Sequence, residues 1–195
     1  QRMPPSLAYQ CFEFQIVDLD NDGDKDMFGT TWENPQFRPV LFFINDGSGH
    51  FTDETLARFS YQRPSDPLYF PFMNMQSNAA GDFDRDGDVD LIVSGGTTVP
   101  RDRESCRMLV NDGTGHFTYD RSAFPADGCA RANSLGDMRV ADFDRDGDLD
   151  LIHPGYIPGI GYWRNDGTGH FADASLTHID PAVRPYSFAA LETGD

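Results

Sequence analysis

A nine-residue segment rich in aspartate occurs three times in this chain and constrains its fold more than any other feature. Each copy places Asp at positions 1, 3, 5, 7 and 9 and Gly at position 6. Five carboxylates in so short a segment repel one another strongly unless a cation lies among them. The copies span residues 18–26, 82–90 and 142–150, and loop positions are counted from the first Asp of each.

The chemistry of these loops favours calcium. Aspartates at alternate positions direct their oxygens to one side of a tight turn, which the glycine allows to close. Hard oxygen ligands in a flexible turn suit Ca²⁺, whereas Mg²⁺ needs a smaller octahedral site, and zinc or copper would favour His or Cys. We expect side chains to bind the ion at positions 1, 3, 5 and 9: Asp18, Asp20, Asp22, Asp26, Asp82, Asp84, Asp86, Asp90, Asp142, Asp144, Asp146 and Asp150. At position 7 the main-chain carbonyl is expected to serve, from Asp24, Asp88 and Asp148.

An EF-hand shares the first half of this pattern but requires Glu at position 12 and flanking helices. Position 12 here is Gly29, Val93 or His153. The residues after each loop form short β-type runs that stop at glycine or proline, so strands rather than helices are expected. Solvated acidic turns without an ion are the other alternative, and three copies in register argue against it.

A second motif, Asn-Asp-Gly-x-Gly-His-Phe, follows each loop after an apolar run. Asp-Gly between two apolar runs is typical of a β-hairpin. Its histidines occupy equivalent places in separate repeats, so we expect them to lie apart and to have structural roles: His50, His116 and His170.

Each repeat therefore contains four expected strands, with the calcium loop between the first two and the hairpin between the last two. The loops recur after 64 residues, from Asp18 to Asp82, and after 60, from Asp82 to Asp142. A four-stranded antiparallel unit repeated at this interval is typical of a β-propeller blade. We expect an all-β chain with blades at about 8–58, 72–122 and 135–178 and the start of a fourth at about 185–195.

The loop combined with Asn-Asp-Gly-x-Gly-x-Phe resembles the FG-GAP/VCBS repeat family, which includes the integrin α-chain propeller and certain fungal and bacterial propeller lectins. The resemblance covers essentially the whole chain and implies a calcium site between the first two strands of each blade. Blades in that family usually number seven. Because Asp195 stands at position 1 of a fourth loop, we expect the chain to be part of a larger propeller or an assembling subunit, with a fourth calcium site completed elsewhere.

Charge and cysteine content bear on the compartment. The formal net charge is −17, and the loops hold fifteen of the thirty-two acidic residues, so three bound Ca²⁺ would bring it to −11. Such a chain is a poor partner for nucleic acid or anionic membranes. No run of eighteen apolar residues exists, and the chain opens with Gln1, which indicates a processed or incomplete N-terminus.

Weak calcium sites fill outside the cell, so we expect a secreted or cell-surface protein. Cys11, Cys106 and Cys129 fit that compartment, and a Cys106–Cys129 disulfide is one pairing that the sequence allows.

Partner binding is expected on the face opposite the calcium loops, where the longer and less repetitive segments lie. Its candidate residues are aromatic or basic: Trp32, Tyr61, Tyr69, Phe70, Arg101 and Arg103. The alternative for the aromatic segment 59–72 is packing between blades.

The sequence thus favours an extracellular, adhesion- or lectin-like module that binds a glycan or a protein, with calcium in a structural role. The alternatives are a propeller of a polysaccharide-active enzyme and a structural subunit of a surface layer or filament. No paired carboxylates outside the loops and no nucleophile with its base are evident, so no catalytic activity is expected.

Overall fold

The computed structural model describes residues 11–31, 40–59, 73–97, 106–125, 137–154 and 159–183. In these ranges the strands form three four-stranded antiparallel sheets, each with its strands in chain order. The first contains β1 (Cys11–Val17), β2 (Asp26–Thr31), β3 (Val40–Asn45) and β4 (Phe51–Asp53). The second contains β5 (Met73–Gly81), β6 (Asp90–Thr97), β7 (Cys106–Asn111) and β8 (Phe117–Asp120). The third contains β9 (Arg139–Ala141), β10 (Asp150–Pro154), β11 (Ile160–Asn165) and β12 (Phe171–Asp173).

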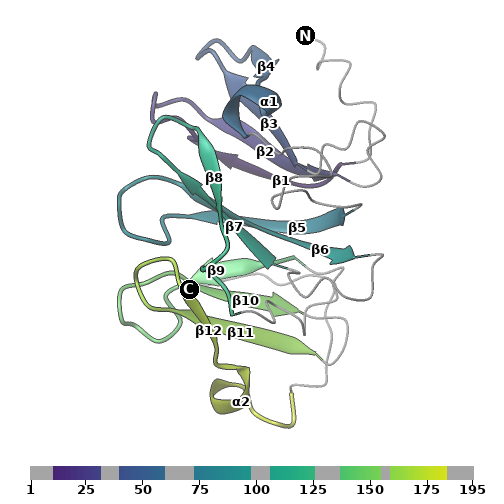
Figure 1. The fold of residues 1–195 in the computed structure, drawn as a ribbon, viewed down its shortest axis with the longest axis vertical. Coiled ribbons are helices and arrows are strands. Elements are labelled where there is room, and N and C mark those ends of the chain that lie inside the picture. Colours follow the sequence, from purple (N-terminus) through teal and green to yellow (C-terminus); the bar gives the residue numbers. More distant parts are fainter. Residues whose placement is uncertain are drawn as a thin grey trace.

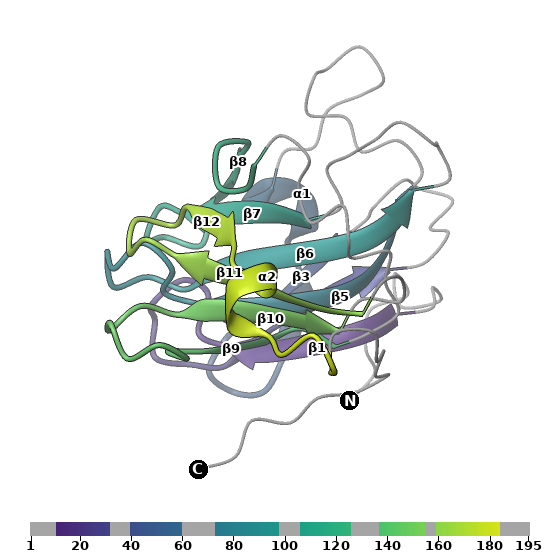
Figure 2. The same cartoon turned by 90° about the horizontal axis from the view of Figure 1, so that it is seen from below.

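The three sheets lie side by side in chain order, from purple through teal to green and yellow (Figure 1). Figure 2 looks from below, so that the third sheet lies in front of the second. This is the arrangement of neighbouring propeller blades, and it confirms the all-β class and the four-stranded unit. We therefore call the sheets blades 1, 2 and 3.

Blade 2 is buried on both faces because its side chains alternate between two apolar cores. On β6, Leu91 and Val93 pack into the core shared with blade 1, and Ile92 packs into the core shared with blade 3. The first core also contains Phe28 and Phe42, whose ring centroids lie 5.1 Å apart. Burial of such side chains contributes about 1.5–3 kcal/mol each, so contact between blades is a main source of stability.

The first strands of the three blades meet at Glu13 on β1. Its carboxylate accepts hydrogen bonds from the Asn78 N–H at 3.0 Å and the Ser77 hydroxyl at 3.3 Å, both on β5. Arg139 on β9 lies 3.7 Å from the same carboxylate. Burial is the main cause that raises the pKa of Glu13. One acidic side chain thus joins all three blades.

Two single-turn helices, α1 (Thr55–Arg58) and α2 (Ser175–His178), follow the fourth strands of blades 1 and 3. The sequence analysis did not predict them, because four residues are too few to show helical periodicity. Phe59, just after α1, is buried and forms a bridge with Phe117 of blade 2. This residue of the aromatic segment is therefore core, and residues 60–72 lie outside the described ranges. In the part of the chain that the structure describes, no helix is long and apolar enough to cross a bilayer.

His153 on β10 is fully buried, and neither ring nitrogen has a hydrogen-bond partner in the described structure. Its ring lies edge-on to Trp163, with centroids 6.3 Å apart. Burial lowers the pKa of His153 to about 4, because the apolar surroundings disfavour the imidazolium.

Blade stability should therefore depend on the protonation of His153. Since the unfolded chain binds the proton more tightly, stability falls as the pH drops from about 6.5 towards 4, by about 2 kcal/mol between pH 7 and pH 5. In urea denaturation, His153→Leu should lose less stability than the parent protein over this interval, while His116→Ala, at an exposed position, should behave like the parent. Equal losses in the parent and His153→Leu would show that the buried imidazole has no such role.

Candidate metal centre

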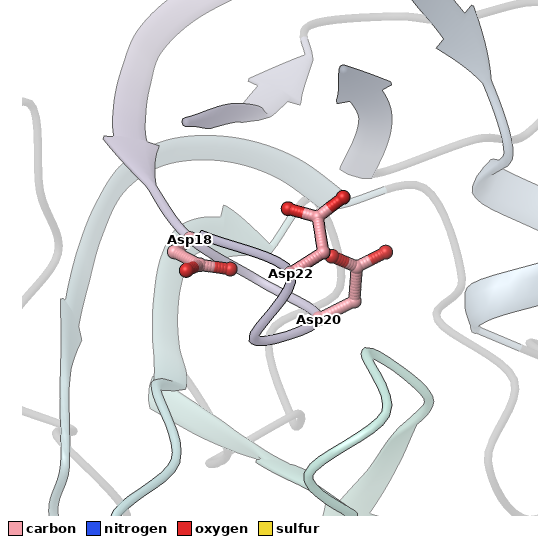
Figure 3. Close-up of side chains that lie close together, drawn as sticks. All are labelled: Asp18, Asp20 and Asp22. Atoms are coloured by element: carbon pink, nitrogen blue, oxygen red, sulfur yellow. The ribbon is translucent and has the colours of Figure 1, made fainter. Parts of the chain in front are cut away.

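The acidic loops connect the first and second strands of each blade, and the structure gathers their carboxylates. Asp18, Asp20 and Asp22 project from one turn (Figure 3), and each offers an oxygen within 4.8 Å of the others. Oxygens of Asp82, Asp84 and Asp86 lie within the same distance of one another, and so do oxygens of Asp142, Asp144 and Asp150. Each loop runs directly into a strand, which excludes the helix-flanked EF-hand arrangement for the described residues.

Two left-handed residues give each loop its shape. Position 4 has a φ of 59° at Asn21, 64° at Arg85 and 65° at Arg145, and the glycine at position 6 also has a positive φ. The bend lets the Gly23 N–H donate to Asp18 Oδ2 at 3.0 Å. The equivalent glycines in the other loops make the same bond, at 3.1 and 3.0 Å.

The carboxylate at position 9 ties the loop to the hairpin. Asp26 is fully buried and accepts the Leu19 N–H through Oδ2 and the Asn45 N–H through Oδ1, both at 2.8 Å. Asp90 and Asp150 accept the equivalent pairs of backbone N–H groups. Loop and hairpin are thereby held as one unit.

Several loop oxygens are buried without a partner. Asp18 Oδ1, Asp20 Oδ1 and Asp82 Oδ1 have essentially no contact with solvent and accept no hydrogen bond in the described structure. A buried, unpaired carboxylate oxygen is costly, and a cation is the partner that would relieve both the desolvation and the mutual repulsion. The donors are all hard oxygens, so the residues present fit Ca²⁺.

The side chain at position 7 points away from this cluster. A Cβ placed on Gly47 would clash with Asp24 Oδ2, so that carboxylate packs against the hairpin turn. The same close approach occurs between Asp88 and Gly113 and between Asp148 and Gly167. This arrangement places loops and hairpins on the same face.

The three loops differ in their arginine neighbours. Arg58 donates to Asp20 in the first loop at 2.9 Å. Arg164 pairs with Asp144 and, at 2.7 Å, with Asp146 in the third loop. Within the described ranges, Asp84 of the second loop has no such partner. Sequence analysis missed these arginines, although Arg164 stands where the other repeats have Ile44 and Val110.

Two carboxylates of the second loop, Asp84 and Asp90, have raised pKa values. Burial raises the pKa of Asp84, with the nearby charges of Asp86 and Asp82 adding to the effect. Burial also raises the pKa of Asp90 to about 7, and the charges of Asp84 and Asp86 contribute. Without a cation, this loop resists holding all its carboxylates ionised.

A hollow of about 430 Å³ lies beside the third loop. The third loop and its hairpin supply its lining: Asp146, Asp148, Arg164, Asn165, Asp166, His170, Phe171 and Ala172. The hairpin histidines contact their own turns, as for His116 and Thr114 at 3.0 Å. His170 also lies 3.1 Å from the Ser122 hydroxyl of blade 2.

Other residues singled out from the sequence lie outside the described ranges. These are the candidate ligand surface, formed by Trp32, Tyr61, Tyr69, Phe70, Arg101 and Arg103, and the fourth-loop residue Asp195. Cys106 is disulfide-bonded, and the side chains of Cys11 and Cys129 are not among those described.

Comparison with known proteins agrees with this geometry. A model of the FG-GAP-like repeat matches residues 18–93 and 82–153. No curated protein sequence matches the chain. This chain aligns with the solved structure of an Agrocybe aegerita lectin, with a TM-score of 0.50 and 19% sequence identity. That structure is described as showing the basis of specific recognition of non-reducing terminal N-acetylglucosamine. The alignment covers 80% of this chain and 36% of the lectin chain, so the chain spans just over a third of that relative.

The fold and the repeated loops thus define a β-propeller module. The chain belongs to the FG-GAP-like repeat family.

The raised pKa of Asp90 gives a prediction for the metal-free protein. Because folded Asp90 binds its proton more tightly than the unfolded chain does, stability in chelator should fall as the pH rises from 5 to 7.5, by about 2.5 kcal/mol from this group. Asp90→Asn should remove that contribution in urea denaturation with EDTA. An unchanged pH slope in the variant would contradict the assignment.

Proposed function

We propose that each loop binds one Ca²⁺ and that the ions are structural elements of an extracellular β-propeller module. The observation that carries this proposal is the set of buried, unpartnered oxygens on Asp18, Asp20 and Asp82. In each loop the side chains at positions 1, 3, 5 and 9 and the carbonyl at position 7 would hold the ion. The bound cation supplies positive charge that offsets the repulsion within the turn.

The expected energetic contribution is modest for each site and useful in sum. Extracellular calcium modules bind with dissociation constants of about 10⁻⁴ to 10⁻³ M. At about 1 mM calcium, mass action then stabilises the fold by roughly 0.4–1.4 kcal/mol per site. Relief of repulsion in the second loop would add to this, because burial and neighbouring carboxylates raise the pKa values of Asp84 and Asp90.

We also propose that the module binds a glycan, without catalysing its cleavage. Support comes from the propeller fold shared with a lectin described as recognising terminal N-acetylglucosamine. Calcium would then act at a distance from the ligand by keeping the blades rigid. The proposed ligand contacts are those suggested by the sequence: Trp32, Tyr61, Tyr69, Phe70, Arg101 and Arg103.

Substitutions within the second loop test the calcium proposal. Asp84→Ala and Asp86→Ala each remove a proposed side-chain ligand, so they should lower the melting temperature in calcium by several degrees and change it little in EDTA. Asp88→Ala is the matched control, because its carbonyl is retained. It should weaken the fold equally in both conditions, through loss of the 2.6 Å contact with Asn21.

Isothermal titration with CaCl₂ should show lower affinity only for Asp84→Ala and Asp86→Ala. An equal drop in both buffers for these two variants would count against ligand roles.

Glycan binding is tested with an array that includes glycans ending in N-acetylglucosamine, probed in calcium and in EDTA. We expect binding in calcium that weakens at least tenfold in Tyr69→Ala and Phe70→Ala with unchanged melting temperature. Leu56→Ala, at an exposed apolar residue of α1, is the control and should bind like the parent. Absence of binding to any glycan by a folded, calcium-loaded protein would refute this part of the proposal while leaving the calcium sites intact.

A further inference from the structure

The position-1 carboxylate of the third loop has more hydrogen-bond partners than its counterparts. Both oxygens of Asp142 accept backbone N–H groups, from Asp146 at 3.1 Å and from Gly147 at 3.0 Å. In the first and second loops the equivalent residue, Asp18 or Asp82, has one oxygen that is buried and accepts no hydrogen bond in the described structure. Position 1 of the third loop is therefore satisfied without a cation.

Arg164 on β11 satisfies the carboxylates at positions 3 and 5 of the same loop. Its guanidinium pairs with Oδ2 of Asp144 and donates to Oδ2 of Asp146 at 2.7 Å. The Oδ1 atom of Asp144 accepts the Asp146 N–H at 3.2 Å, and that of Asp146 accepts the Asp148 N–H at 3.1 Å. All four oxygens thus have a donor within blade 3.

The position-9 carboxylate of the third loop also gains a donor from β11. The Tyr162 hydroxyl donates to Asp150 Oδ2 at 2.7 Å, in addition to the two backbone N–H groups that this carboxylate accepts. The first and second repeats have Phe42 and Met108 at this place, and neither side chain carries a hydrogen-bond donor. Tyr162 and Arg164 therefore stabilise the carboxylates of the third loop from one strand.

The arginine of the first loop has a smaller effect. Arg58 contacts one oxygen of Asp20, and the other oxygen of that carboxylate is buried without a partner. Arg164 holds two carboxylates at once, and a guanidinium and Ca²⁺ are attracted to the same oxygens. Because the Arg164 side chain is 49% exposed, it can move into solvent without leaving an apolar site.

We propose that Arg164 is an internal counter-cation of the third loop, which makes this loop the weakest of the three calcium sites and the last to fill. This inference rests on the proposed binding of one Ca²⁺ by each loop. Without calcium, Arg164 holds Asp144 and Asp146 in place. Calcium enters the third loop by displacing the guanidinium into solvent. Blade 3 thus keeps its loop when calcium falls below the level that fills the other two.

The glycines at position 6 provide one reporter for each loop. Their N–H groups donate to the position-1 carboxylates, so the amide resonances of Gly23, Gly87 and Gly147 should shift when their own loop binds the ion. In a CaCl₂ titration followed by ¹⁵N–¹H NMR, the midpoint for Gly147 should lie at a calcium concentration at least tenfold higher than those for Gly23 and Gly87.

Substitutions of Arg164 test its role. Arg164→Gln removes the charge and keeps a polar side chain, so it should lower the Gly147 midpoint to that of the other glycines. Arg164→Lys keeps the charge and should leave this midpoint raised. Arg121→Gln is the matched control, because it removes an exposed arginine that lies 5.6 Å from the centre of the Tyr119 ring. It should leave all three midpoints unchanged.

Melting temperature gives a second readout that does not depend on resolving the sites. In EDTA, Arg164→Gln should melt several degrees below the parent protein, because the third loop then has no counter-cation. Saturating calcium should remove this difference, since the ion replaces the lost charge.

The outcomes separate this inference from the calcium proposal itself. Equal midpoints for the three glycines in the parent, or a Gly147 midpoint that Arg164→Gln does not lower, would overturn the role of Arg164 and leave calcium binding intact. A Gly147 resonance that never responds, while Gly23 and Gly87 do, would exclude the third loop as a site. No response from any of the three, with no heat in isothermal titration, would refute the calcium proposal and this inference together.

Discussion

The structure depends on the way nine residues hold five carboxylates in one turn. Backbone N–H groups take up part of the charge: Gly23 donates to Asp18, and Leu19 and Asn45 donate to Asp26. The bonds to Asp26 join the loop to the start of the hairpin. A change in the charge of the loop should therefore also affect the pairing of the third and fourth strands. Among the oxygens left without a partner are those of Asp18, Asp20 and Asp82, at loop positions 1 and 3, where a divalent ion would contribute most.

Contact between blades extends this local order over the whole fold. A single four-stranded sheet has two apolar faces and cannot bury both by itself, whereas blade 2 does so because it has a neighbour on each side. Near the first strands, Glu13 accepts bonds from blade 2 and lies beside Arg139 of blade 3. Near the loops, Asn111 and Asn165 cross to the preceding blade. The polar contacts therefore lie at both ends of the strands, with apolar packing between them.

Sequence analysis predicted the strand order and the loop positions because both follow from local signals that recur at a fixed spacing. The structure packs the side chains of Asp24, Asp88 and Asp148 against the hairpin glycines, and binding through their main-chain carbonyls stays a prediction. Sequence analysis missed Arg58, Arg164 and the position-4 side chains, because their partners lie on other segments and no periodicity marks them. The role of Glu13 was hidden for the same reason, since its neighbours are about 65 and 125 residues away along the chain.

Position 4 of the loop combines two opposing demands. A left-handed backbone favours glycine; Asn tolerates it, whereas a residue such as Arg loses about 1–2 kcal/mol there. Asn21 and Arg85 adopt this backbone conformation, and their side chains contact Asp88 and Asp148 in the following sheet. An idealised repeat designed only for relaxed dihedral angles would place glycine at this point. Its individual units would gain stability, but the cooperativity of the array would decline because each unit could then melt with less effect on its neighbour.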